Sequence, residues 1–470
     1  MILPKNGRVI IIDDEPAQAV PLISALSKFN IATTYFDARK ETLPLKRFND
    51  VRVVFLDINL VGGAQPDWHS EKAILINNIT SIIEPQTPYI LFVWSVNESD
   101  HFEDLVKLFD ADLNSYKPIV PLIKMDKNEM FNQNIGDDGI VEWTLNYSIE
   151  ETIQLIKQKI NEGVSTIDSF EALLKWENIV SASTTDITNE IVFLANREGN
   201  LNEELKKIYY KLAESMWGNT VKGKGVIEII TQSLSVFNKM FLDNLDNNLR
   251  TKLTIDYLTN VVEPEDFSYD TICLLNSKLI LTNSEKGIHI PGNIYKIKDE
   301  TGVVKSIINE LKDRSSFYPD FCEKAGVKLS EAITPSGNLI SKLKSDFNVY
   351  FTGKIEEIIS KSVYIGLEIT PICDYTQGKR IYPRILPGLI IDDAYYKYFK
   401  TKTESCTITP PLHINGTKQR LLFEFRYLNT HEAEKFLNEE SIFRLREQMI
   451  TEIQSKLAGN INRPGVIFLQ

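Results

Sequence analysis

The stretch from Arg8 to Glu15 constrains the fold more than any other part of the chain. It is an apolar run, Val9-Ile10-Ile11-Ile12, that stops on Asp13 and Asp14. A strand that is apolar on both sides is typical of a parallel sheet covered by helices on both faces, because neither side meets water. The two carboxylates then lie at the carboxyl end of the strand, where open α/β sheets bind their ligands.

Three later apolar runs end on polar side chains in the same way. The run 51–56 stops on Asp57, and the run 89–94 stops on Ser95. The run 119–123 leads into Lys124 and Lys127. Because parallel strands end at one edge of the sheet, we expect these acids, this hydroxyl and a lysine to converge there. Helical patterns lie between the runs, so the sequence predicts a doubly wound sheet.

This set of groups indicates a particular chemistry. Clustered carboxylates repel one another and raise each other's pKa unless a cation lies between them, so a hard divalent ion such as Mg²⁺ is the expected occupant. A carboxylate that accepts a phosphoryl group needs the same neighbours, since a metal ion and an ammonium neutralise the charge that develops. An α/β domain whose strands end on acids by chance is the alternative.

On these residues the segment 1–135 resembles a response-regulator receiver domain, which has a flavodoxin-like fold. Two features depart from that family: the lysine-proline step occurs here only as Lys117-Pro118, ahead of the fourth run, and the stretch from Val61 to His69 is longer than usual. The resemblance implies Asp57 as phosphoacceptor, Asp13, Asp14 and the Asn59 carbonyl as further Mg²⁺ ligands, Ser95 as the hydroxyl that follows the phosphoryl group, and Lys124 or Lys127 as the paired lysine.

Length and composition predict several folded domains. A chain of 470 residues with 43% hydrophobic residues exceeds what one core usually serves. After the receiver-like segment, long helical periods predict an all-helical domain over 148–260. Short strands with Pro-Gly punctuation then predict an α+β domain over 271–470, with a small β-barrel and a terminal helix. We interpret Val349–Thr352 as one of its strands.

The third segment contains a polar cluster at Cys373 and Asp374, with Gln377, Lys379 and Arg380 close in sequence. A cysteine beside basic residues can act as a nucleophile, and zinc binding by Cys373, Cys406 and His413 is conceivable. A structural turn explains the same residues, and we infer no independent catalytic site from them. The four cysteines are widely spaced, which favours reduced thiols.

The charge of each segment and the lack of targeting and DNA-binding motifs limit the kinds of partner that we expect. The segment 136–270 is strongly acidic and 271–470 is mildly basic, and no basic recognition helix is evident, so we do not expect nucleic acid as a partner. No signal peptide or membrane-length apolar run is evident, which predicts a cytoplasmic protein without a membrane partner.

Two hypotheses for function remain. The first is a phosphoprotein of a two-component system that receives a phosphoryl group on Asp57 from a histidine kinase and acts through protein contacts. In overall layout the chain resembles receiver proteins of phage-defence operons of the Detocs type. There a kinase, a receiver protein and an effector protein share an operon, and the receiver is thought to drain phosphoryl groups from the effector. The second hypothesis is a receiver-controlled effector whose C-terminal domain is an enzyme or nucleic-acid-binding module.

Overall fold

The structure is a computed structural model of the chain. It describes residues 8–60, 68–95, 101–135, 141–164, 169–196, 200–254, 261, 263, 267–283, 290–299, 302–376, 382–400, 404–430 and 441–461. Backbone contacts divide the chain into two units, residues 1–209 with 230–262 and residues 210–229 with 263–470. Among the helices described, none is long and apolar enough to cross a membrane.

The N-terminal part is a five-stranded parallel sheet, as the sequence predicts. The strand order is β2-β1-β3-β4-β5, which is the flavodoxin-like order, and its switch point lies between β1 and β3. The strands are β1 (Arg8–Ile12), β2 (Thr33–Phe36), β3 (Val51–Leu56), β4 (Ile90–Ser95) and β5 (Ile123–Asp126).

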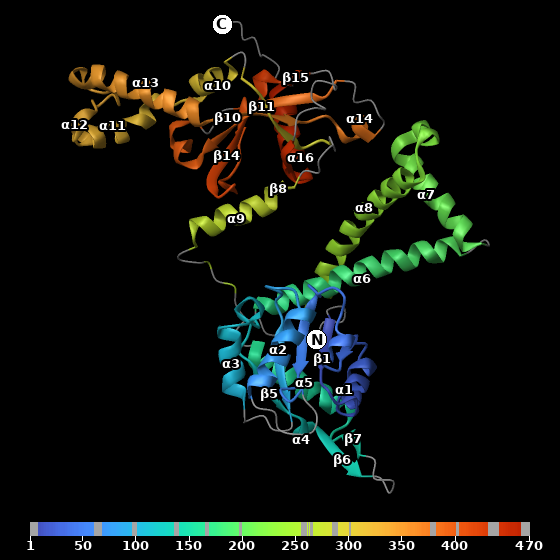
Figure 1. The fold of residues 1–470 in the computed structure, drawn as a ribbon. Helices are drawn as coiled ribbons and strands as arrows, with labels where there is room; N and C mark the ends of the chain where they lie inside the picture. The colour runs from blue at the N-terminus through green and yellow to red at the C-terminus, as the bar shows by residue number, and fades with distance from the viewer. Residues whose placement is uncertain are drawn as a thin grey trace. The chain divides into compact units, whose positions relative to one another are not determined.

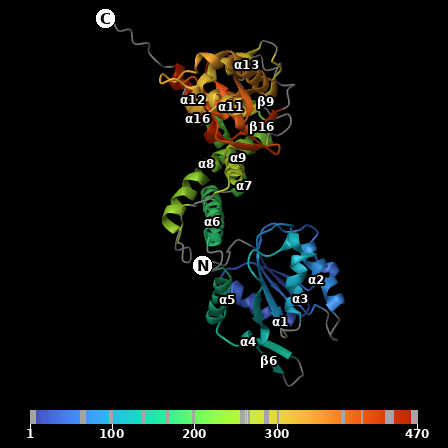
Figure 2. The same ribbon diagram turned by 90° about the vertical axis from the view of Figure 1, so that its left-hand side faces the viewer.

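Helices cover both faces of this sheet (Figure 2). On one face, alternate strand residues such as Ile11 and Phe55 pack against α1 (Pro16–Lys28) and α5 (Ile149–Val164). On the other face, their neighbours pack against α2 (Trp68–Ile82) and α3 (Phe102–Asp110). This two-sided burial is the physical reason for strands that are apolar throughout.

The edge of the sheet at β5 differs from the prediction. The fourth apolar run, 119–123, is not a strand over its whole length, and β5 begins only at Ile123. Pro118 and Pro121 have no backbone N–H to give to a ladder, which explains why pairing starts after them. As a result the strand ends at Asp126, and Lys127 follows directly as the first residue of α4 (Lys127–Met130).

An unpredicted hairpin lies between α4 and α5. Its strands β6 (Phe131–Ile135) and β7 (Val141–Leu145) form a two-stranded antiparallel sheet, which projects from the α/β part (Figure 1). The helix α5, which we assigned to an all-helical domain from residue 148, packs through Ile153, Ile156 and Ile160 in the core of the parallel sheet. The receiver-like part therefore continues beyond the predicted boundary at residue 135.

Long helices follow, in agreement with the predicted helical middle (Figure 1). They are α6 (Ser169–Ala195), α7 (Leu201–Trp217) and α8 (Val226–Lys252). Arg52, next to the first residue of β3, holds Glu177 of α6 with Nη2–Oε1 and Nε–Oε2 distances of 2.6 and 3.0 Å. Within the same unit Asn248 of α8 donates to Ser183 of α6 at 2.8 Å. The Arg52–Glu177 contact ties the first half of α6 to the amino-terminal edge of the sheet, and the Asn248–Ser183 bond ties α8 to α6.

The C-terminal part is an antiparallel sheet between two helical layers. The strand path is β12-β14-β11-β10-β9-β16-β8, with β13 on β14 and β15 on β11. The strands are β8 (Leu281–Thr282), β9 (Asn293–Lys296), β10 (Val363–Glu368), β11 (Arg384–Asp392), β12 (Cys406–Ile408), β13 (Leu412–Ile414), β14 (Thr417–Glu424), β15 (Asn429–Thr430) and β16 (Ser441–Leu445). Among the residues described, this path is open, so the predicted small barrel is not supported.

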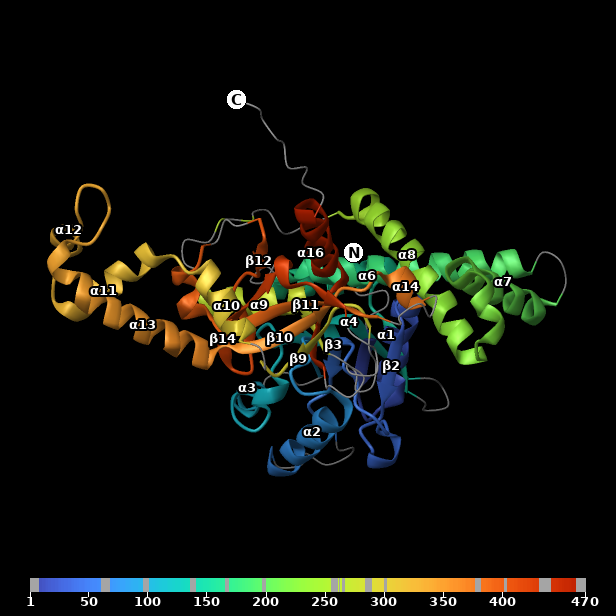
Figure 3. The same cartoon turned by 90° about the horizontal axis from the view of Figure 1, so that it is seen from above.

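The helices of this part are α9 (Tyr269–Ile280), α10 (Val303–Leu311), α11 (Tyr318–Ala325), α12 (Leu329–Ala332), α13 (Lys344–Lys361), α14 (Ile372–Thr376) and α16 (Glu447–Ile461). Helices α10, α11 and α13 pack on one face of the sheet and α16 packs on the other. Figure 3 shows α11, α12 and α13 extending beyond the strands. Our interpretation of 349–352 as a strand is wrong, because these residues belong to α13.

Candidate functional site

The acid cluster forms at the carboxyl edge of the parallel sheet. Asp13 and Asp57 follow β1 and β3, and the backbone ladder continues into both residues, since Asp13 N–H donates to Phe36 O and Asp57 N–H to Ile12 O. Ligand oxygens of Asp13, Asp14 and Asp57 all lie within 4.8 Å of one another. The three predicted carboxylates are therefore brought together by the strand register.

Lys127 lies at the centre of this cluster. Its side chain is fully buried, and Nζ is 2.7 Å from Asp13 Oδ2 and 2.5 Å from Asp57 Oδ2. Nζ also donates to Oε1 of Gln18 on α1 at 2.5 Å. Lys124 lies elsewhere: its residue is exposed, and Nζ sits 4.3 Å from the centre of the Phe102 ring. Of the two lysines left open by the sequence, the geometry brings Lys127 to the acids.

The remaining predicted residues lie around Asp57. The Asn59 amide N–H donates to Asp57 Oδ1 at 3.1 Å, and its side-chain nitrogen lies 3.4 Å from Ser95 Oγ. Ser95 is fully buried at the end of β4, in register with Asp126. Lys117 of the lysine-proline step pairs instead with Asp110 on the surface. Val61–Asp67, most of the long stretch after Asp57, lies outside the described residues.

Two residues that the sequence analysis did not predict, Trp94 and Gln18, hydrogen-bond to the cluster. Trp94 donates its indole Nε1–H to Asp13 Oδ2 at 3.0 Å. Gln18 is buried, and its Oε1 accepts a hydrogen bond from Lys127 Nζ, while its own amide nitrogen donates to Glu15 Oε2 at 2.5 Å. Gln18 lies five residues after Asp13, on the helical turn that faces the strand end, and its position after the acid pair was the available signal. Nothing in the strand pattern distinguishes Trp94 from a core residue.

Burial and crowding raise the pKa of Asp57 and of Asp14. Removal from water raises the pKa of Asp57 to about 6; the charge of Asp13 adds to this effect, and Lys127 opposes it. The pKa of Asp14 is also raised, mainly by burial and then by its neighbours Asp13 and Glu15. Three carboxylates around one ammonium carry an excess of negative charge, which a divalent cation would neutralise. The donor set, made of carboxylate oxygens, fits Mg²⁺.

A cavity of about 770 Å³ lies beside Asp14. Its walls come from the turn after β2 and from α2, and include Arg39, Lys40, Leu60 and Ile74. Between β2 and β3, a stretch described in full, the chain forms a short 3₁₀ helix at Lys40–Thr42 instead of an α-helix. Asp14 is therefore approachable from the side of β2, whereas Asp13 and Asp57 are buried behind it.

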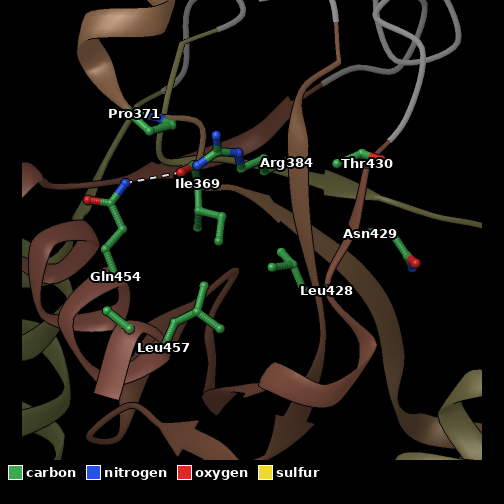
Figure 4. Close-up of a pocket in the computed structure, with 9 residues that line it drawn as sticks. Ile369, Pro371, Arg384, Leu428, Asn429, Thr430, Gln454 and Leu457 are labelled. Atoms are coloured by element: carbon green, nitrogen blue, oxygen red, sulfur yellow. Dashed lines mark hydrogen bonds between the residues drawn. The ribbon is translucent and has the colours of Figure 1, made fainter. Parts of the chain in front are cut away.

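A second cavity of about 790 Å³ lies in the C-terminal part (Figure 4). Figure 4 shows Ile369, Leu428 and Leu457 directed into it, with Arg384 at its rim. Gln454 Nε2–H donates to Ile369 O at 3.0 Å and closes one side. Arg384 lies 3.8 Å from Asp374 of the predicted Cys373–Arg380 cluster. The Cys373 side chain and residues 377–380 lie outside the described parts, so the structure does not test whether this cluster is a structural turn, a nucleophile or part of a zinc site.

Comparisons with known proteins add little. No family model matches the chain, and no curated protein matches it. Among solved structures, full-length FixJ from B. japonicum matches with a TM-score of 0.19 and 15% sequence identity, over 52% of this chain and 96% of that one. A TM-score this low supports no argument about this chain. The likeness to receiver domains rests on the strand order and the geometry of the acid cluster.

Proposed function

We propose that the chain is a phosphoacceptor protein in which Asp57 receives a phosphoryl group from a histidine kinase. The observation that carries this proposal is the position of Lys127, whose buried ammonium bridges Asp57 and Asp13 beside the half-buried Asp14. A nucleophilic carboxylate held between a fixed cation and a metal-binding acid pair is the arrangement that phosphoryl transfer needs.

The chain's own residues supply most of the chemistry. Asp57 attacks phosphorus with a carboxylate oxygen while the P–N bond to the kinase histidine breaks and the imidazole leaves. Asp57 must therefore be ionised, which a pKa of about 6 allows at neutral pH. Lys127 then neutralises negative charge on the transferred group, and the Ser95 hydroxyl would donate to one of its oxygens. Asp13, Asp14 and Asp57, with the Asn59 carbonyl, would hold Mg²⁺, which supplies further neutralisation when bound.

Output through protein contacts is the second part of the proposal. Phosphorylation would change the surface of the α/β part, and that change would alter binding of a kinase or an effector protein, or remove phosphoryl groups from a relay as in Detocs-type defence operons. This part rests on the resemblance in layout. The genes next to the coding gene would test it, since a kinase and a toxic effector are expected there.

The phosphoacceptor is tested directly by mass. Incubate the full chain with acetyl phosphate and Mg²⁺ and measure intact mass: the wild type is expected to gain one phosphoryl group, and Asp57→Asn none. Asp50→Asn, on the loop before β3, is a matched control that should be phosphorylated like the wild type. A phosphoryl group on the Asp57→Asn variant would overturn the assignment.

The alternative is an effector activity in the C-terminal part. The cavity with an apolar floor and Arg384 at its rim favours it, because such cavities of a few hundred Å³ commonly bind small molecules. Purified protein can be incubated with nucleotides, RNA and DNA, with and without acetyl phosphate. The effector hypothesis predicts that binding or turnover depends on the phosphoryl donor and is lost in Arg384→Gln. That result would favour an effector function over output through protein contacts.

A further inference from the structure

Trp94 connects the acid site to the hairpin. It is fully buried near the end of β4, and its Nε1–H donates to Asp13 Oδ2 at 3.0 Å. Its ring lies 5.7 Å from the Lys127 ammonium. One side chain therefore contacts both an acid and the lysine of the site, although the phosphoacceptor chemistry assigns it no role.

The hairpin in turn packs on Trp94. Phe131, the first residue of β6, is buried and meets Trp94 edge-on, with ring centres 5.0 Å apart and planes at 80°. Trp143 of β7 meets Phe131 edge-on at 6.3 Å and 90°. Edge-to-face pairs of this kind stabilise a fixed ring orientation. Phe55 of β3 closes the other side of Trp94 at 5.9 Å and 74°.

The backbone provides a second connection. Lys127 is the first residue of α4, and Phe131 directly follows its last residue, Met130. The hairpin therefore contacts the site through Lys127, along one helical turn, and through Trp94, by ring packing. Asn146, just after β7, ties this turn down, because its side chain donates to the carbonyls of Asn128 and Glu129 at 3.0 and 2.9 Å.

Asp13 is oriented by three donors. Oδ2 receives the Trp94 indole and lies 2.7 Å from Lys127, and Oδ1 accepts the N–H of Glu15 at 2.9 Å. Groups that hydrogen-bond a metal-ligating side chain fix its direction, and their removal typically weakens metal binding about 10- to 100-fold. Two of these donors are tied to the hairpin: Trp94 through ring packing on Phe131, and Lys127 through the backbone of α4.

We propose that Trp94, held by Phe131, which itself packs on Trp143, is a positioning residue of the acid site, and that the β6–β7 hairpin is thereby a structural part of that site. Its task is to hold Asp13 and Lys127 in the geometry that binds a divalent cation. The proposal rests on the proposed function only in taking Mg²⁺ as the cation. Metal binding is measured without any phosphoryl donor, so the two can fail separately.

The test is a Mg²⁺ titration of the full chain by calorimetry. Trp94→Phe keeps a ring between Phe55 and Phe131 but removes the N–H donor, and Mg²⁺ affinity should fall about tenfold. Phe131→Leu keeps the donor and loosens its clamp, and a loss of about threefold is expected. Trp217→Phe, the same substitution in the small core of Trp217 with Ala213 and Val221, is the control and should leave the affinity unchanged.

A spectroscopic measurement excludes a merely structural role. In a ¹H–¹⁵N spectrum, the indole resonance missing from Trp94→Phe belongs to Trp94, and it should shift on addition of Mg²⁺ while that of Trp217 does not. The proposal is overturned if folded Trp94→Phe and Phe131→Leu both bind Mg²⁺ like the wild type, if the Trp94 resonance does not respond, or if the wild type binds no Mg²⁺. Trp94-dependent Mg²⁺ binding without phosphorylation of Asp57 would instead refute the proposed function alone.

Discussion

Two groups of carboxylates, one in each unit, show opposite electrostatic design. Around Lys127 three acids are crowded, and burial raises the pKa of Asp57 to about 6. In the C-terminal part Glu357 accepts from Lys354, Lys361 and the Tyr395 hydroxyl, each at 2.8 Å, and these hydrogen bonds lower its pKa to about 2. The first group has one ammonium for three acids, whereas Glu357 has two ammonium groups for one carboxylate.

This difference indicates which of the two groups of acids is suited to bind a metal ion. An acid with more donors than it needs is satisfied by the protein alone, and it contributes to stability. Acids that share a single ammonium are satisfied only when a further cation arrives, so they suit a metal site. Asp320 belongs to the satisfied kind: although burial opposes the effect, hydrogen bonds from Lys397 and Tyr398 lower its pKa.

The largest expected effect tests the role of Lys127. Lys127→Ala removes the buried ammonium from Asp13 and Asp57, and the rate of phosphorylation by acetyl phosphate should fall about 100- to 1,000-fold, as for other fixed charge-stabilising groups. Lys124→Ala is the control and should change the rate less than about twofold, because that ammonium lies over Phe102. Equal losses in both variants would contradict the assignment.

The lysine also shows what sequence could and could not predict. The ends of β1, β3 and β4 were predictable because each apolar run stops abruptly on a polar residue, and the first run stops on two. The end of β5 was not, since its pattern is broken by Pro118 and Pro121, and the pairing of Ser95 with Asp126 decides which lysine faces inward. The spacing of Ile153, Ile156 and Ile160 predicts a helix face but cannot say which sheet it covers.

Other failures concern aromatic and helical patterns. Phe347, Phe351, Ile355 and Ile358 are buried at helical spacing in α13. Of the run 349–352, which we interpreted as a strand, only Phe351 belongs to that buried face, and Val349 is exposed. The role of Trp94 depends on contacts with residues 81 positions earlier and 37 positions later in the chain. No local pattern contains that information.

The two groups of acids should differ in how much Mg²⁺ binding depends on them. Asp14→Asn removes one negative ligand from a group that needs a cation, and Mg²⁺ affinity measured by calorimetry should fall at least about 100-fold. Asp320→Asn, at the acid of the C-terminal part that Lys397 and Tyr398 satisfy, is the control and should leave Mg²⁺ binding unchanged. An unchanged affinity in Asp14→Asn would mean that the acid cluster is not the metal site.

Without a metal ion, the buried charge of Asp57 should lower the stability of the folded protein. The folded pKa of Asp57, about 6, is higher than in the unfolded chain, so the folded state binds the proton more tightly. Without Mg²⁺, Asp57→Asn should therefore be more stable than the wild type at pH 7.5, by on the order of 2 kcal/mol. The gap should narrow as the pH falls through 6 toward 4. Urea unfolding in EDTA measures the free energy of unfolding of the wild type and of Asp57→Asn at each pH. A difference between them that does not change with pH would contradict this account.

The smallest effect, and the one of opposite sign, concerns Glu357. Its folded pKa, about 2, is lower than in the unfolded chain, so its contribution to stability is complete above pH 4.5 and is lost as the pH falls toward 2. The side chain is 36% exposed, and solvent screening limits the contribution to about 1 kcal/mol or less. Glu357→Gln keeps an acceptor for Tyr395 but loses the charge. Hydrogen exchange in α13 should be faster than in the wild type at pH 6, and the difference should shrink at pH 3 once intrinsic rates are corrected. If the difference were the same at both pH values, Glu357 would act through packing and the electrostatic contrast between the two units would fail.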